Sequence, residues 1–266
     1  MELLIQLSII FAISIGVNMF FFVIAFLVQK DLFTDITYAS TFLITMIIQM
    51  AISHNYGINI IIALILIALW SVRLGTFLFI RILKEKVDHR FDKMRGSFYK
   101  FFMFWLLQGI TVFIVAMPSY MVTIFGKDEF NLLSLIGIIG AAISLLFETI
   151  ADIQKYRYYS KGNKKFIDYG LWKISRHPNY FGEYMFWIFN FVFVVLSTNN
   201  PLIWISIVGP LFILTLLYFV SGLPLLEKVM YKKFGEDEQY KKYLSKTPRI
   251  VPFIGIKGIK KKWAKK

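Results

Sequence analysis

The amino-acid sequence predicts an all-α integral membrane protein with about seven transmembrane helices. Hydrophobic residues make up 58% of its 266 residues and the mean hydropathy is +0.64, which is too apolar for a soluble domain. Apolar runs of helix length recur along the sequence, and lysine and arginine gather in only some of the segments between them. These observations together favour a single polytopic membrane domain, residues 1–266.

The apolar runs approach the roughly 20 residues that an α-helix needs to cross a bilayer. In chain order they cover residues 3–28, 37–53, 58–80, 99–123, 130–151, 181–198 and 201–222. The second run is interrupted by the polar residues Gln49, Ser53 and His54, and the sixth run is short. Seven helices is the prediction, and counts of six or eight stay open.

The basic residues predict the orientation of these helices. Residues 81–95, 155–176 and 228–266 hold 26 of the 30 lysines and arginines, and seven helices put all of them on the same side. On the opposite side, the loops near residues 54–57, 124–129 and 198–200 contain a single basic residue, Lys127. Because cytoplasmic loops carry the excess of basic residues, we expect the N-terminus outside and the C-terminus in the cytoplasm.

The net charge of +14 bears on the partners of the protein. Basic runs beside anionic lipid explain this charge, so we expect membrane lipids and no nucleic acid as partners. The basic tail, residues 254–266, is interpreted as an anchor to the lipid surface. The sequence has no cysteine and only three widely separated histidines, so no metal site is expected.

Two polar clusters lie at the predicted cytoplasmic ends of the third and fifth runs. Arg73 lies about two turns inside the predicted membrane edge, where it either snorkels to the headgroups or serves a site within the helices. Glu148 and Asp152 are four residues apart and share one helical face. Arg157 follows them, within reach of a phosphate. Solvation at the edge of a loop is the alternative for this second cluster.

The densest polar cluster is the run 170–183, where a charged loop meets an apolar run. Its polar members that we expect at a site are Arg176, His177, Asn179, Tyr180 and Glu183. The two basic groups can pair with phosphate, and a carboxylate at the depth of Glu183 needs a polar or charged partner. A fourth cluster, around Glu227 and Tyr231, has the spacing of an amphipathic interfacial helix, and a structural role for its tyrosines is the alternative.

The run Gly-Leu-Trp-x-x-Ser-Arg-His-Pro-Asn-Tyr-Phe-Gly-Glu at 170–183 resembles the signature of bacterial membrane proteins related to steroid 5-alpha-reductases. Further segments fit that family: Trp70-x-x-Arg73-Leu74, Leu107-Gln108-Gly109 and Glu148-x-x-x-Asp152-x-Gln154. The resemblance covers about residues 65–253. The wider group also includes sterol reductases and isoprenylcysteine or phospholipid methyltransferases.

The resemblance implies a cytoplasm-facing site that holds NADPH in the inner or plasma membrane of a bacterium. Asn179 and Glu183 match an Asn-x-x-x-Glu pair near the nicotinamide, and Asp152 and Arg157 fall near the adenosine and phosphate end. The other residues that we expect at the cofactor are Arg73, Glu148, Arg176, His177, Glu227 and Tyr231. The sequence departs from the mammalian enzymes at Glu227, where they carry a histidine, and it has no clear counterpart of their N-terminal glutamate.

The expected activity is NADPH-dependent reduction of an activated C=C bond, such as an enone, in a steroid-like or other lipophilic substrate. Glu183 is the expected catalytic anchor, and Tyr180 or Tyr184 is the candidate proton donor. The alternative is a lipid or isoprenylcysteine methyltransferase that uses S-adenosylmethionine, because such enzymes share Arg-His-Pro-x-Tyr. A membrane protein without catalytic activity is the third hypothesis. The sequence leaves substrate identity and oligomeric state open.

Overall fold

The computed structural model describes residues 2–28, 34–85, 96–127, 129–220 and 222–253. Every regular element within these ranges is a helix, which confirms the predicted all-α class. The helical stretches long and apolar enough to cross a membrane are Leu3–Val28, Thr34–Ser53, Ile58–Ile80, Phe98–Val115, Leu132–Ser160, Pro178–Leu196 and Pro201–Phe234. Among the residues that the structure describes, the predicted count of seven is confirmed, and these are the helices of a multi-pass membrane protein. The predicted orientation of the two termini stays a prediction.

The chain divides into two compact units. The first comprises residues 1–141 and 187–213, and the second comprises residues 142–186 and 214–266. Two long helices, α7 (Leu135–Ser160) and α9 (Pro178–Leu196), contribute residues to both units. The single membrane domain expected from the sequence stays a prediction, as does the lipid-anchoring tail 254–266, which lies outside the described residues.

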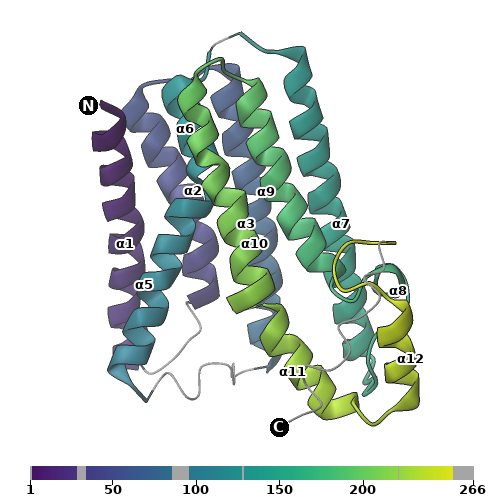
Figure 1. Cartoon of the computed structure of the whole chain (residues 1–266). Coiled ribbons are helices and arrows are strands. Elements are labelled where there is room, and N and C mark those ends of the chain that lie inside the picture. Colours follow the sequence, from purple (N-terminus) through teal and green to yellow (C-terminus); the bar gives the residue numbers. More distant parts are fainter. Residues whose placement is uncertain (1, 29–33, 86–95, 128, 221, 254–266) are drawn as a thin grey trace. The chain divides into compact units, whose positions relative to one another are not determined.

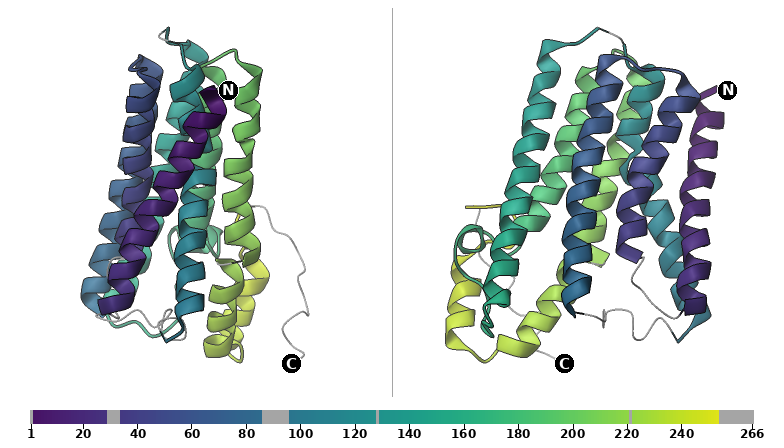
Figure 2. Two further views of the ribbon diagram at one scale, coloured as in Figure 1. Left: turned by 90° about the vertical axis from the view of Figure 1, so that its left-hand side faces the viewer. Right: turned by 180° about the vertical axis from the view of Figure 1, so that it is seen from behind.

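The first unit is built on packing between long helices (Figures 1 and 2). Its helices α1 and α2 pack against each other, α1 also packs on α5, and α2 packs on α3. The elements of this part of the chain are α1 (Glu2–Val28), α2 (Thr34–Ser53), α3 (Ile58–Glu85), α5 (Phe98–Val115), α6 (Met117–Phe125), the 3₁₀ turns η2 (Leu132–Ser134) and η3 (Pro201–Ile207), and α10 (Val208–Thr215).

A row of polar residues on α2 ties the first unit together. Its buried members are spaced three or four residues apart, on one helical face: Thr34, Thr37, Thr41, Thr45 and Gln49. The hydroxyl groups of Thr45 and Tyr120 lie 2.7 Å apart, and Gln49 Nε2 donates to Gln6 Oε1 at 2.8 Å. Hydrogen bonds of this kind join helices whose apolar surfaces have no preference for each other over lipid.

The fourth predicted run, 99–123, consists of two helices. The helix α5 ends at Val115, Ala116 has a backbone conformation outside the helical region, and α6 begins at Met117. Pro118 lies in the first turn of α6, and a proline can neither donate a helical hydrogen bond nor fit inside a continuous helix. The break therefore follows from the sequence, although hydropathy alone did not reveal it.

The fifth and seventh runs extend beyond their predicted ends. The helix α7 continues to Ser160, so Asp152 and Arg157 are helical. The seventh stretch contains a π-helix, η4 (Leu216–Val220), and continues as α11 (Leu223–Phe234). The second unit also contains the short α8 (Leu171–Ile174) and α12 (Glu238–Lys246).

Candidate functional site

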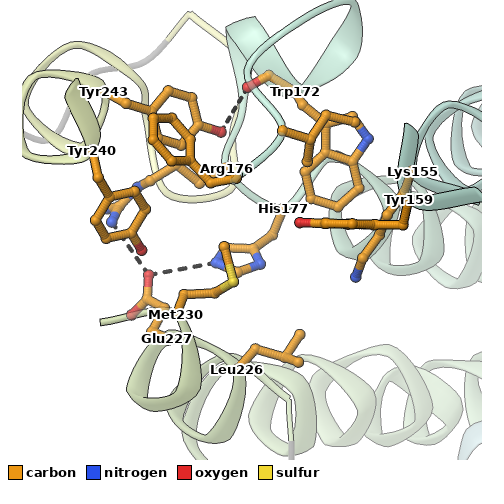
Figure 3. Close-up of a pocket in the computed structure, with 12 residues that line it drawn as sticks. Lys155, Tyr159, Trp172, Arg176, His177, Leu226, Glu227, Met230, Tyr240 and Tyr243 are labelled. Carbon is orange, nitrogen blue, oxygen red and sulfur yellow. Dashed lines mark hydrogen bonds and ion pairs between the residues drawn. The ribbon is translucent and has the colours of Figure 1, made fainter. Parts of the chain in front are cut away.

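The second unit contains a small cavity (Figure 3). Residues of α7, α11 and α12 line it, together with the segment that connects α7 to α9. Its volume is about 70 Å³. Arg176, His177 and Glu227 lie together on one side of the cavity, and the rest of the lining is aromatic or aliphatic apart from Lys155 (Figure 3). The lining residues are Lys155, Tyr159, Phe166, Ile167, Trp172, Arg176, His177, Leu226, Glu227, Met230, Tyr240 and Tyr243.

One face of α7 leads into this cavity. Glu148, Asp152, Lys155 and Tyr159 follow one another at spacings of three or four residues, so they share a helical face. The two carboxylates are buried, with exposed fractions of 4% and 6%, whereas Lys155 and Tyr159 line the cavity. Lys155 Nζ lies 5.3 Å from the centre of the Trp172 ring, a cation–π contact.

Gly170 allows the loop after α7 to turn back onto that helix. Its φ is +59°, and a Cβ at this position would lie 2.5 Å from Gln154 Oε1. Gln154 Oε1 accepts a hydrogen bond from the backbone N–H of Leu171 at 2.9 Å, and Trp172 Nε1 donates to the Ala151 carbonyl at 3.0 Å. Only glycine allows both the positive φ and the close approach to Gln154, so the first residue of the 170–183 run has a structural role.

The charged wall of the cavity centres on Glu227 of α11. Arg249 donates to it from Nη2 at 2.7 Å and from Nε at 3.1 Å to each carboxylate oxygen. Arg176 Nη1 lies 3.4 Å from Glu227 Oε1, and His177 Nε2 lies 3.5 Å from the same oxygen (Figure 3). We call Arg176, His177 and Arg249 the basic cluster. Arg176 Nε is buried and has no hydrogen-bond partner among the described residues.

The segment 247–250 holds the basic cluster in place from the C-terminal side. The backbone N–H of Arg176 donates to the Pro248 carbonyl at 2.8 Å, and Ser175 Oγ donates to the Ile250 carbonyl at 2.6 Å. Tyr243 Oη donates to the Trp172 carbonyl at 2.7 Å. The loop before α9 is therefore fixed by a part of the chain more than 70 residues away in sequence.

Burial sets the protonation of the groups at the cavity. It lowers the pKa of His177 below the usual range, and the hydrogen bond to Glu227 offsets this only in part. Burial also raises the pKa of Tyr240 to about 12 and raises the pKa of Tyr243. At neutral pH, His177 is therefore uncharged and both tyrosines keep their protons, so positive charge at the site comes from arginine and lysine.

The helices α7 and α9 come close together at Gly182, next to Glu183. A Cβ on Gly182 would lie 2.6 Å from Glu148 Cβ and 2.8 Å from the Glu148 backbone nitrogen. Glu183, the next residue of α9, is buried with an exposed fraction of 9%. The glycine of the 170–183 run thus lets the acidic face of α7 approach the residue beside Glu183.

The structure brings some of the expected site residues together. Arg176, His177 and Glu227 line the cavity, and the Tyr180 ring stacks on the His177 ring with 5.9 Å between centroids. Asn179 and Tyr184 are half-buried in the first two turns of α9. Glu148, Asp152 and Glu183 are buried on α7 and α9.

Apart from Arg176, His177 and Glu227, the lining of the cavity contains none of the expected residues. Arg157 and Tyr231 are exposed on α7 and α11. Arg73 is half-buried on α3, in the first unit. Lys155 and Arg249 were not assigned to the site from the sequence. Lys155 had a signal, since it continues the helical face of Glu148 and Asp152, whereas the contacts of Arg249 depend on the fold.

Comparison with known proteins identifies a family. The family model described as "Protein of unknown function (DUF1295)" matches residues 21–247, including the run 170–183 and Glu227. The chain belongs to this family.

A curated relative from the fission yeast Schizosaccharomyces pombe, named only as an uncharacterized protein, is 23% identical to this DUF1295 chain over 220 residues. The match covers 69% of this chain and 60% of the yeast protein, so the chain spans less than two thirds of that relative. No solved structure matches the chain.

Proposed function

We propose that this DUF1295 protein is an NADPH-dependent membrane oxidoreductase that reduces an activated C=C bond, such as an enone, in a lipophilic substrate. The observation that carries the proposal is the cavity to which the 170–183 run contributes Trp172, Arg176 and His177, because its lining combines cationic and aromatic side chains. The resemblance of that run to the steroid 5-alpha-reductase signature supports the same activity.

The charge of the site favours a cofactor that carries phosphate. Lys155 and Arg176 line the cavity, and Arg249 lies behind Glu227, so positive groups outnumber the single carboxylate of the lining. The sulfonium of S-adenosylmethionine is itself a cation and gains nothing from these neighbours. Phosphate oxygens pair well with arginine, which supports NADPH over the methyltransferase alternative.

The residues present fit one end of such a cofactor. Arg176 Nε is a buried donor that needs an acceptor, and the rings of Trp172 and Tyr240 offer surfaces for a base. The cavity of about 70 Å³ is smaller than the roughly 300–1,000 Å³ of typical ligand sites, so it accommodates only a part of a dinucleotide.

Residues of α9 would act at the reacting end. When bound, NADPH supplies the hydride for the β carbon of the substrate. Asn179 and Glu183, one helical turn apart, would hold its carboxamide by hydrogen bonds. Tyr180 and Tyr184 are the candidates to donate, from Oη, the proton that completes the reduction. The stacking of Tyr180 on His177 would limit the positions of the Tyr180 hydroxyl.

The first experiment is a binding comparison on the full chain purified in detergent. NADPH and S-adenosylmethionine are titrated in parallel by calorimetry, with Glu183→Ala and Arg176→Gln as test variants. Lys173→Gln is the control for Arg176→Gln. It removes the same positive charge at an exposed residue of α8 that does not line the cavity.

NADPH binding that weakens at least about tenfold in both test variants and not in the control supports the proposal. Selective binding of S-adenosylmethionine would favour the methyltransferase. Binding of neither by a folded sample would reject both enzymes and favour a protein without catalytic activity.

A further inference from the structure

The basic cluster already holds an anion, the side chain of Glu227. Its carboxylate accepts from Arg249 at 2.7 Å and lies 3.4 Å from Arg176 Nη1. Arginine uses the same planar donor fork for carboxylate and for phosphate. A phosphate group that enters the cluster must therefore compete with Glu227 for the same nitrogen atoms.

We propose that Glu227 is an internal competitor for a phosphate-binding site formed by Arg176, His177 and Arg249. Phosphate displaces the carboxylate, pairs with both arginines and accepts a hydrogen bond from neutral His177. This inference rests on the proposed function and deepens it, because it states how the cofactor site is kept closed in the absence of ligand.

The cluster does not depend on Glu227 alone for its geometry. The Arg249 guanidinium lies 4.7 Å from the centre of the Tyr218 ring, and the Arg176 backbone is bonded to Pro248. Both cations thus keep a neighbour when the carboxylate leaves. Arg176 Nε also remains a buried donor that Glu227 does not satisfy, so the present anion leaves the site incomplete.

The helix that carries Glu227 is interrupted just before it. The π-helix Leu216–Val220 and Gly222 precede α11, and π-helical turns are rare and frequently lie at functional sites. Glu227 begins the second turn of α11, and Leu226 and Met230 of the same helix line the cavity. Movement of α11 at this interruption would withdraw Glu227 and enlarge the cavity at the same time.

Pyrophosphate binding by the full chain in detergent tests the proposal. The variant is Glu227→Gln, which keeps the size of the side chain and removes the charge. Its control is Glu238→Gln, which removes the same charge from an exposed residue of α12 paired with Lys241 at 2.7 Å. Calorimetry with inorganic pyrophosphate should give binding about tenfold or more tighter in Glu227→Gln than in wild type or the control. Equal or weaker binding in Glu227→Gln would overturn the proposal and leave Glu227 a structural clamp.

A measurement on the wild type covers the case in which Glu227→Gln does not fold. Saturating pyrophosphate should speed hydrogen exchange of the α11 amides, since the ion pairs that hold this helix are broken. Unchanged or slower exchange there would count against displacement. NADPH is titrated into the same samples. If Glu227→Gln binds pyrophosphate more tightly but no sample binds NADPH, Glu227 competes with phosphate and the reductase proposal fails. If NADPH binds but Glu227→Gln binds pyrophosphate no more tightly than wild type, the reductase proposal stands and the competitor role of Glu227 fails.

Discussion

Arg249 and Glu227 form a two-pronged ion pair, with Nη2 to Oε2 at 2.7 Å and Nε to each oxygen at 3.1 Å, although 22 residues separate them. The pair is mostly buried, with side-chain exposed fractions of 17% and 19%. It joins the last described segment of the chain to α11, and it holds Glu227, which lines the cavity.

Removal of Arg249 should destabilise the second unit. Arg249→Ala leaves Glu227 mostly buried without its closest partner, at a cost of roughly 1–3 kcal/mol in the free energy of unfolding. Arg249→Lys should recover only a part, because an ammonium cannot supply the two-pronged contact. Thermal unfolding in detergent measures the effect. Lys241→Ala, which breaks an exposed pair, is the control, and an equal loss in both alanine variants would contradict the importance of this ion pair.

Gly182 should not tolerate a side chain. In Gly182→Ala the new Cβ would lie 2.6 Å from Glu148 Cβ, so α7 and α9 must separate. This separation should lower the free energy of unfolding by roughly 1–3 kcal/mol. Gly16→Ala in α1 is the matched control, since nothing lies within 4 Å of its Cβ position and alanine favours a helix. Comparison of the two unfolding temperatures checks this. Equal stability would mean that α7 and α9 are not in tight contact at this position.

The glutamine pair of the first unit should show coupling between α1 and α2. Gln49→Leu leaves the buried Gln6 amide without the partner that donates at 2.8 Å, at roughly 0.6–2 kcal/mol. The double variant Gln6→Leu with Gln49→Leu should recover a part of this loss, because no unmatched amide remains. A double-mutant cycle on unfolding free energies measures the coupling, and strictly additive losses would show that the two side chains do not interact.

Acidification should weaken the second unit through His177. Burial lowers the pKa of His177 in the folded chain, so the unfolded chain takes up this proton first as the pH falls. The contribution of this residue to stability is therefore constant above its usual pKa of about 6.5 and falls below it, until the pH reaches the lowered value. The neighbours act in both directions, since Glu227 raises the pKa of His177, whereas Arg176 and Lys155 lower it.

Thermal unfolding between about pH 5 and pH 8 measures this dependence. His177→Gln should flatten the acid side of the curve, whereas His54→Gln, at an exposed position of the first unit, should leave it unchanged. The same slope in wild type and His177→Gln would assign the acid sensitivity to other groups.

The two ends of α7 should lie on opposite sides of the membrane. Because the natural chain has no cysteine, a single cysteine can report the exposure of each loop. Lys127→Cys should react with a membrane-impermeant thiol reagent in intact cells, and Lys161→Cys only after permeabilisation. The reverse pattern would invert the predicted orientation, with the N-terminus in the cytoplasm.

The helical class and the seven spans were predictable because the thickness of the bilayer sets the length of an apolar helix. The break at Ala116 was also encoded in the sequence, by Pro118, but a hydropathy pattern does not detect it. For the site, the run 170–183 contains Arg176 and His177, which line the cavity, and their role at a cofactor stays a prediction. Arg157 and Tyr231 have residue types as suitable as Lys155 and Tyr240, yet they are exposed and do not line the cavity.

The sequence by itself thus determined the helical spans, the segregation of basic residues and the location of the polar run that begins α9. Only the tertiary structure decided that Glu227, Tyr243 and Arg249 meet that run. Hydropathy and charge patterns act along a helix and across the bilayer, where each residue responds to its local surroundings. At the cavity, the contact between the rings of Phe166 and Tyr243 joins residues 77 positions apart, so it depends on the path of the chain between them.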